Sequence, residues 1–265
     1  MYGFSFDRAS SVQDAVAKAA KGAQLLAGGQ TLLASMKQRL TSPESLVDLA
    51  AIADLQGICK DGNAMVIGAM TRHQEVAHNK ELQSTIPGLA RLAGGIGDRQ
   101  VRAMGTMGGS VANNDPAACY PSGVLGLGAT IKTNRREIAA DSFFKGMFST
   151  ALEPGELIVA IRFPIPKASG YAKFKQPASR YALLGVFVAK TDAGVRVAIT
   201  GGGNGVYRHA GLEAALTKDF SAAAVDSVAV SAADLTSDLH ASAEYRAQLV
   251  KVQTKRAVQQ ALGNA

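Results

Sequence analysis

The chain has 265 residues, of which 47% are hydrophobic and 18% charged, a composition that indicates a globular protein and excludes a disordered one. Its formal net charge is +7, but the Lys and Arg residues are scattered and do not alternate with aromatic residues, so no nucleic-acid partner is expected. No stretch of 18 apolar residues occurs, so we expect no membrane span.

The N-terminal sequence and the cysteines narrow the class of protein further. Residues 1–8 lack the basic start and apolar core of a signal peptide, which predicts a cytoplasmic protein. Cys59 and Cys119 stand far apart and no Cys-x-x-Cys occurs, so this chain alone cannot build an iron–sulfur cluster or a structural zinc site. The histidines do not cluster, and no Ser-His-Asp or Cys-His set argues for hydrolysis. We therefore predict neither metal ligands nor catalytic residues.

The first part, predicted over residues 1–57, is a small α/β unit. Ser11 and Asp14 form a capping pattern, and apolar residues then recur at helical spacing. The expected elements that follow are a short strand, a loop over 28–31, a helix over 32–40 and a strand over 45–49.

The second part, predicted over residues 58–168, combines hairpins and helices. In chain order we expect a hairpin turning at 61–63, helices that begin after Thr71 and at Pro87, a loop over 105–121, a helix over 122–127, a hairpin turning at Asn134, a strand over 157–163 and a linker over 164–170.

The third part, predicted over residues 169–265, has strands first and helices later, which is typical of an α+β unit. Its expected elements are strands over 171–175, 183–190 and 195–200, and helices near 208–217, 221–229 and 242–262.

Two glycine-rich stretches are the most distinctive motifs. In residues 25–33 an apolar run ends at Gly28-Gly29, and a polar pair and a helix start follow, an order that places a phosphate on backbone amides. Residues 105–121 contain three glycines within five positions, then hydroxyl, amide and carboxylate side chains. Successive amides in such a loop favour anions, although a plain turn between strands is the alternative. Together the two stretches predict a ligand with two phosphates, and neither matches the Rossmann or P-loop pattern.

With these motifs the chain resembles the FAD-binding medium subunits of the molybdenum hydroxylases, such as aerobic carbon monoxide dehydrogenase, and the flavin domain of xanthine dehydrogenase. The resemblance extends over nearly the whole chain, and the segments that carry it are Ala27–Leu33, Thr106–Ser110, Asp115–Ala118 and Tyr171–Phe174. It implies an α+β fold, with a two-part FAD-binding region of the PCMH type followed by a smaller α+β domain of three strands and helices.

The resemblance, together with the motifs, also predicts the FAD-binding residues. They are Ala27, Gly28, Gly29, Gln30, Thr31, Leu32, Leu33, Ile96, Gly105, Thr106, Gly108, Gly109, Ser110, Asn114, Asp115, Cys119, Ile158, Lys175 and Tyr181. It implies that the glycine stretches hold the pyrophosphate, that Ile96 lies near the adenine and that Tyr181 lies on the isoalloxazine face. Without the resemblance, Ile96, Ile158 and Tyr181 are interpreted as core residues and Lys175 as an exposed charge.

Cys119 departs from the family, which usually has an Asp at this position that hydrogen-bonds the cofactor. A thiol is a weak donor and a poor acceptor, so we expect weaker FAD binding, unless Asn114 or Asp115 supplies the contact. The alternative for Cys119 is a small buried residue without a redox role.

By resemblance, the chain is an FAD-binding electron-transfer subunit of an oxidoreductase complex. A small partner subunit is expected to hold [2Fe–2S] clusters and a large partner subunit to hold molybdopterin. Together with this chain they are expected to form a heterotrimer, and two heterotrimers a dimer. Electrons are expected to leave FAD for an external acceptor. Two alternatives stay open: a self-sufficient FAD oxidoreductase, and a non-enzymatic nucleotide-binding protein.

Overall fold

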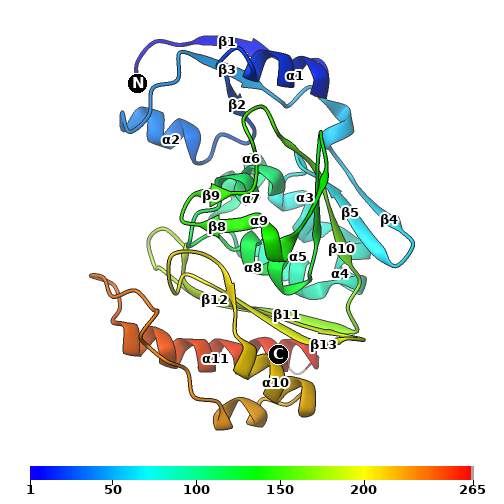
Figure 1. The fold of residues 1–265 in the computed structure, drawn as a ribbon, viewed down its shortest axis with the longest axis vertical. Helices are drawn as coiled ribbons and strands as arrows, with labels where there is room; N and C mark the ends of the chain where they lie inside the picture. Colours follow the sequence, from blue (N-terminus) through cyan, green and yellow to red (C-terminus); the bar gives the residue numbers. More distant parts are fainter. Residues whose placement is uncertain (264–265) are drawn as a thin grey trace.

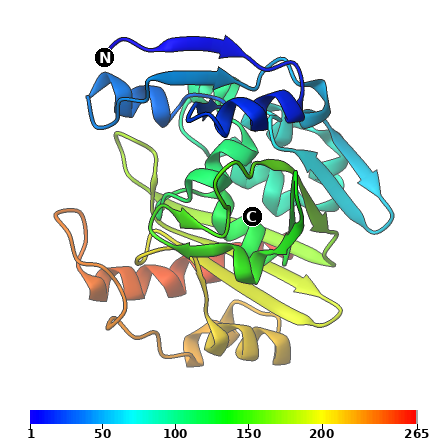
Figure 2. The same ribbon diagram turned by 45° about the horizontal axis from the view of Figure 1, so that its top comes forward.

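The computed structural model describes residues 1–263, in which three main sheets follow one another along the longest axis of the molecule (Figure 1). The N-terminal sheet lies at one end, the C-terminal sheet at the other, and most of the helices lie in the middle (Figures 1 and 2). This mixed architecture confirms the predicted α+β class. No helix among residues 1–263 is both long and apolar enough to cross a membrane.

The first sheet is parallel and has the order β1-β3-β2. Its elements are β1 (Ser5–Arg8), α1 (Val12–Ala19), β2 (Gln24–Leu26), α2 (Leu32–Lys37), β3 (Ser45–Asp48) and the 3₁₀ helix η1 (Ala53–Leu55). The predicted cap of α1 is confirmed, since the Ser11 hydroxyl accepts a hydrogen bond from the Asp14 N–H at 3.1 Å. Strand β1 was not predicted, because all four of its residues are exposed at a sheet edge and show no alternation.

The middle sheet is antiparallel, with the order β4-β5-β10-β6-β7. Its strands are β4 (Ile58–Asp61), β5 (Ala64–Gly68), β6 (Thr130–Thr133), β7 (Glu137–Ala139) and β10 (Ile158–Pro164), and a small hairpin pairs β8 (Phe144–Gly146) with β9 (Ser149–Thr150). The accompanying helices are α3 (His73–His78), α4 (Lys80–Thr85), α5 (Pro87–Gly94), α6 (Arg99–Met104), α7 (Met107–Asn113), α8 (Tyr120–Gly126) and α9 (Ala140–Phe143). Both predicted hairpins and the helix start at Pro87 are confirmed.

The predicted loop over 105–121 is wrong, because most of it forms α7 and the first turn of α8. Glycine disfavours a helix interior, but here it permits a close approach: a Cβ atom on Gly108 would lie 2.8 Å from the Cα of Ala69. The Thr106 hydroxyl caps α7 by accepting from the Gly109 N–H at 3.3 Å. Tertiary contact and capping therefore override the weak helix propensity of this sequence.

The last sheet has the order β11-β12-β13-β14, and α11 covers its face that points away from the middle sheet (Figure 1). Its elements are β11 (Ala168–Lys175), β12 (Ala182–Thr191), β13 (Gly194–Thr200), β14 (Tyr207–Arg208), α10 (Ala210–Lys218), the 3₁₀ helix η2 (Ala223–Ser227) and α11 (Ala243–Ala261). Phe187 on β12 packs into the central core on the other face of this sheet.

Three expectations for this region need correction. The linker predicted over 164–170 is shorter, because β11 begins at Ala168 and the backbone at Gly170 packs directly against Ala257 of α11. The helix predicted over 221–229 is only the 3₁₀ helix η2, and β14 was not predicted. For the domains we propose the same boundaries, 1–57, 58–168 and 169–265, because each main sheet falls within one part to within a residue.

Candidate cofactor-binding site

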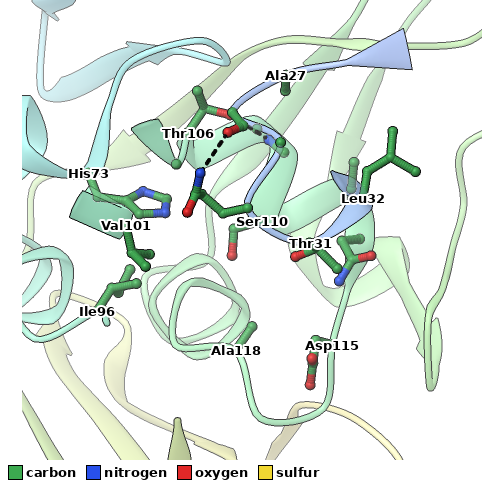
Figure 3. A pocket seen from close by; sticks show the side chains of 18 of the residues that line it. Ala27, Thr31, Leu32, His73, Ile96, Val101, Thr106, Ser110, Asp115 and Ala118 are labelled. Carbon is green, nitrogen blue, oxygen red and sulfur yellow. Dashed lines mark hydrogen bonds between the residues drawn. The ribbon is translucent and has the colours of Figure 1, made fainter. Parts of the chain in front are cut away.

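A cavity of about 730 Å³ lies where the three parts of the chain meet. Its walls come from residues 24–49 of the first part, 69–158 of the second and 173–181 of the third. In Figure 3, His73, Val101 and Ile96 lie on one side, Thr31, Leu32 and Asp115 on the other, and Thr106 and Ser110 between them. The volume falls within the range of about 300–1,000 Å³ that is typical of ligand pockets.

Most of the predicted binding residues are brought together here. Every one of them except Leu33, Asn114 and Lys175 lines the cavity. Tyr181, for which a core position was the alternative, is 43% exposed and lies on the cavity wall, so its ring is available to a ligand. Burial, followed by the charge of Asp115, raises the pKa of its phenol. The phenol therefore stays protonated at neutral pH and can act as a hydrogen-bond donor.

The first glycine stretch presents unused donors to the cavity. Within residues 1–263, the backbone N–H groups of residues 28–31 donate to no protein acceptor. Gly29 has φ 69°, a left-handed conformation that glycine adopts without strain. A Cβ atom on Gly28 would lie 2.7 Å from the Cα of Gly105 and closer still to the carbonyl oxygen of Met104. Free amides in a concave, close-packed backbone are what a phosphate group requires.

The second glycine stretch differs from the expectation, since its amides are already bonded within the protein. The Gly108 N–H donates to the Ala69 carbonyl at 2.8 Å, and the Gly109 and Ser110 N–H groups donate to the hydroxyl and carbonyl of Thr106. This stretch therefore offers a ligand close backbone approach and the Ser110 hydroxyl, whereas the free amides come from the first stretch.

The three predicted residues that do not line the cavity have other contacts. Leu33 turns back under Gly29, and its Cδ1 would lie 2.8 Å from a Cβ atom there. Asn114 is fully buried and holds the β8–β9 hairpin through its side-chain amide. Lys175 is exposed, and it lies just after a shift of register in the pairing of β11 with β12, between Phe174 and Lys175.

Lys173 lines the cavity instead, although the sequence reasoning favoured Lys175. Its ammonium group donates to the carbonyls of Gly95 at 2.7 Å and Arg180 at 3.0 Å, and lies 3.3 Å from the Cys119 sulfur. It therefore ties together stretches from the second and third parts of the chain. Lys173 belongs to the motif Tyr171–Phe174, so the sequence did indicate this segment as part of the site. The register shift between Phe174 and Lys175 could not be predicted from the sequence.

Cys119 lies at the first position before α8, is 5% exposed and faces the cavity. The nearby Lys173 ammonium is the partner that a carboxylate at this position would have. Asp115 also lines the cavity, and its Oδ1 already accepts from the Ala117 N–H at 2.8 Å. Because the Asn114 amide is committed to the hairpin, it is not the substitute contact that the sequence suggested.

Two titratable residues of the cavity wall were missed by the sequence reasoning. His73 is buried, and burial together with the charges of Arg102 and Arg72 lowers its pKa to about 4. Hydrogen bonds from the Arg136 guanidinium lower the pKa of Glu156 to about 2. At neutral pH the wall therefore carries a neutral imidazole and a paired carboxylate, and Lys173 adds a positive charge to the same cavity wall.

Comparison with known families decides the assignment of the fold. Residues 2–166 match the family described as the FAD binding domain in molybdopterin dehydrogenase. The chain belongs to this family. The match covers both glycine stretches and every predicted binding residue of the first two parts, so the FAD-binding domain expected from the resemblance is confirmed.

Full-length relatives extend the similarity to the third part of the chain. The chain is 35% identical to the carbon monoxide dehydrogenase medium chain of Afipia carboxidovorans, over 99% of this chain and 98% of that one. It is 36% identical to the glyceraldehyde dehydrogenase medium chain of Sulfolobus acidocaldarius, over 70% and 69%. The solved structure of reconstituted CO dehydrogenase from Oligotropha carboxidovorans matches with a TM-score of 0.91 and 34% identity, covering 100% of both chains. This chain is therefore a flavoprotein subunit of the medium-chain type.

Proposed function

We propose that this chain is the FAD-carrying electron-transfer subunit of a molybdenum hydroxylase-type complex. The observation that carries the proposal is the cavity, which is lined by residues 28–31 with their four free backbone amides, and also by Ser110, Lys173 and the accessible Tyr181. In this proposal the first glycine stretch binds the pyrophosphate and Tyr181 packs against the flavin ring. Bound FAD supplies the electron-carrying chemistry, and the chain supplies binding, orientation and electrostatics.

The chain's own residues define what the protein contributes. The amides of residues 28–31 orient the anionic part of the ligand, while Ile96 and Ile158 supply apolar walls. Lys173 holds the wall formed by residues 95–97 and 176–181 in place through its two carbonyl contacts. The positive charge of Lys173 also favours a negatively charged form of the flavin over a neutral form.

The same proposal requires partner subunits, because the sequence has no cysteine pattern for a cluster. We infer a small subunit with [2Fe–2S] clusters that delivers electrons to this chain, and a large subunit with molybdopterin that oxidises the substrate. The name "medium chain" carried by the relatives supports an assembly with a larger and a smaller chain. A dimer of heterotrimers and a quinone, NAD or oxygen as acceptor belong to the proposal, and the cytoplasmic location stays a prediction.

The ligand is tested by titrating the purified chain with FAD and with FMN. We expect a yellow protein whose bound cofactor is FAD by mass spectrometry, and much weaker binding of FMN, which lacks the second phosphate and the adenosine. Comparable affinity for the two flavins would contradict the assignment of the glycine stretches. A chain that stays colourless with added FAD would favour the non-enzymatic alternative.

The partners are tested by purifying a tagged chain from the cells that produce it. We expect two further proteins in stoichiometric amounts, one of them carrying iron and sulfide and the other molybdenum. A monomer that binds FAD and oxidises a substrate unaided would instead identify a self-sufficient flavin oxidoreductase.

A further inference from the structure

The β8–β9 hairpin is attached to the cavity by one buried residue, Asn114. The Asn114 side-chain amide donates to the carbonyls of Gly146 at 2.7 Å and Ser149 at 2.8 Å, and the backbone carbonyl of Asn114 accepts from the Phe148 N–H at 3.1 Å. Asn114 adopts a left-handed conformation with φ 44° at the end of α7, the helix that carries the second glycine stretch. The position of the hairpin tip is therefore set by the end of α7, the helix whose residues Gly108, Gly109 and Ser110 line the cavity.

Phe148, at the tip of this hairpin, is unusual in two respects. It has φ 53°, a conformation that is rare and unfavourable for a large side chain. Its ring is 58% exposed and yet forms part of the cavity wall. A left-handed backbone at Phe148 and an exposed apolar ring do not by themselves stabilise the folded chain. Two hydrogen bonds donated by the Asn114 side chain and one accepted by its backbone carbonyl hold a strained backbone in place, and they hold an apolar ring at the edge of the cavity.

We propose that Phe148 is a positioning residue that retains the cofactor, with its ring covering part of the cavity opening and Asn114 keeping the ring there. The inference rests on the proposed function, since it takes FAD as the ligand of the cavity. An exposed aromatic ring beside a bound flavin dinucleotide gains contact area that it lacks in the free chain, and aromatic rings pack well against the planar rings of a nucleotide. The effect is on release of FAD and needs no step in electron transfer.

The test compares Phe148→Asn with the matched variant Met147→Asn in the FAD-loaded full-length chain. Asn tolerates the left-handed conformation, so Phe148→Asn removes the ring and keeps the backbone. Met147 is 52% exposed and does not line the cavity, which makes it the control. After dilution, the rate of FAD release is followed by the recovery of free-flavin fluorescence, and the melting temperature of the FAD-free chain is measured in parallel.

We expect Phe148→Asn to release FAD about tenfold faster, with a melting temperature of the FAD-free chain that is unchanged or higher. Met147→Asn and the conservative variant Phe148→Tyr should release FAD at the wild-type rate. Asn114→Ala should also release FAD faster, and adding it to Phe148→Asn should give little further acceleration, because both act through one ring.

Two outcomes overturn the proposal in distinguishable ways. If the wild-type chain binds FAD and Phe148→Asn releases it at the wild-type rate, the retaining role is wrong and the proposed function stands. If the wild-type chain binds no FAD at all, both are wrong. A lower melting temperature of FAD-free Phe148→Asn, with unchanged release, would assign Phe148 to the stability of the hairpin instead.

Discussion

A Cβ atom placed on Gly28 would lie 2.7 Å from the Cα of Gly105, so the two glycine stretches, about 75 residues apart, are in backbone contact. The contact joins the first part of the chain to the second directly behind the free amides of residues 28–31. Its effect is to fix the position of these amides relative to the helix α7 that carries Ser110.

Gly28→Ala should therefore disturb both folding and cofactor binding. We expect the free energy of unfolding to fall by about 1–3 kcal/mol, the usual range for overpacking, and the FAD dissociation constant to rise. Gly94→Ala is the matched control, because a Cβ atom there meets only Ala77 at an ordinary distance of 3.7 Å. Chemical denaturation and flavin titration measure the two effects. Wild-type stability of Gly28→Ala would show that the contact between the stretches is loose.

Lys173→Met should weaken the cavity wall, whereas Lys175→Met should not. Hydrogen bonds from a charged donor contribute about 1.5–3 kcal/mol, and removing Lys173 leaves the carbonyls of Gly95 and Arg180 without it. We expect a lower melting temperature and weaker FAD binding for Lys173→Met, measured by thermal denaturation and flavin titration. If both variants lose melting temperature and FAD affinity to the same extent, Lys175 contributes to the site as well.

Cys119→Asp is expected to keep the fold and to bind FAD more tightly. The new carboxylate would lie beside the Lys173 ammonium and at the start of α8, two surroundings that stabilise a negative charge. Cys119→Ser, of similar size and without charge, is the control. The amount of FAD retained after gel filtration measures the effect. Weaker retention with an intact circular dichroism spectrum would mean that Cys119 is only a packing residue.

Acid should destabilise the FAD-free chain through His73. Its pKa is about 4 in the folded state and 6.5 ordinarily, so between these values the unfolded chain binds the proton more readily than the folded chain does. The free energy of unfolding should therefore fall by roughly 3 kcal/mol as the pH decreases from 6.5 to about 4. Urea denaturation across this range should show the slope in the wild type and in the exposed-site control His78→Gln. His73→Gln should lose it, and an unchanged slope in that variant would assign the effect to other groups.

The sequence was informative where local chemistry decides the structure. The Ser11 cap, the hairpin at Asp61–Asn63 and the helix start at Pro87 follow from residue types whose preferences act over a few positions. The glycine stretches could be placed in one site for the same reason, because close backbone approach leaves a visible requirement for glycine.

Features set by tertiary contact could not be predicted in this way. In the helix over residues 107–113, Gly108 packs against Ala69, and nothing within the segment itself indicates this neighbour. The irregular pairing between Phe174 and Lys175 depends on the register with β12. The low pKa of His73 depends first on the burial of its ring by the fold, and then on the charges of Arg102 and Arg72. In each case the deciding partner is remote in sequence or visible only after folding.

The cavity takes its walls from all three parts of the chain, and this has a consequence for the amount of protein in a cell. Only the folded chain brings these walls together, so a ligand held there adds to folding stability by mass action, by about 2.7 kcal/mol when its free concentration is a hundred times its dissociation constant. In a cell starved of riboflavin, the vitamin from which FAD is made, newly made chains would remain susceptible to proteolysis for longer. Vitamin supply would thus act on how much of the subunit accumulates, before any effect on turnover is seen.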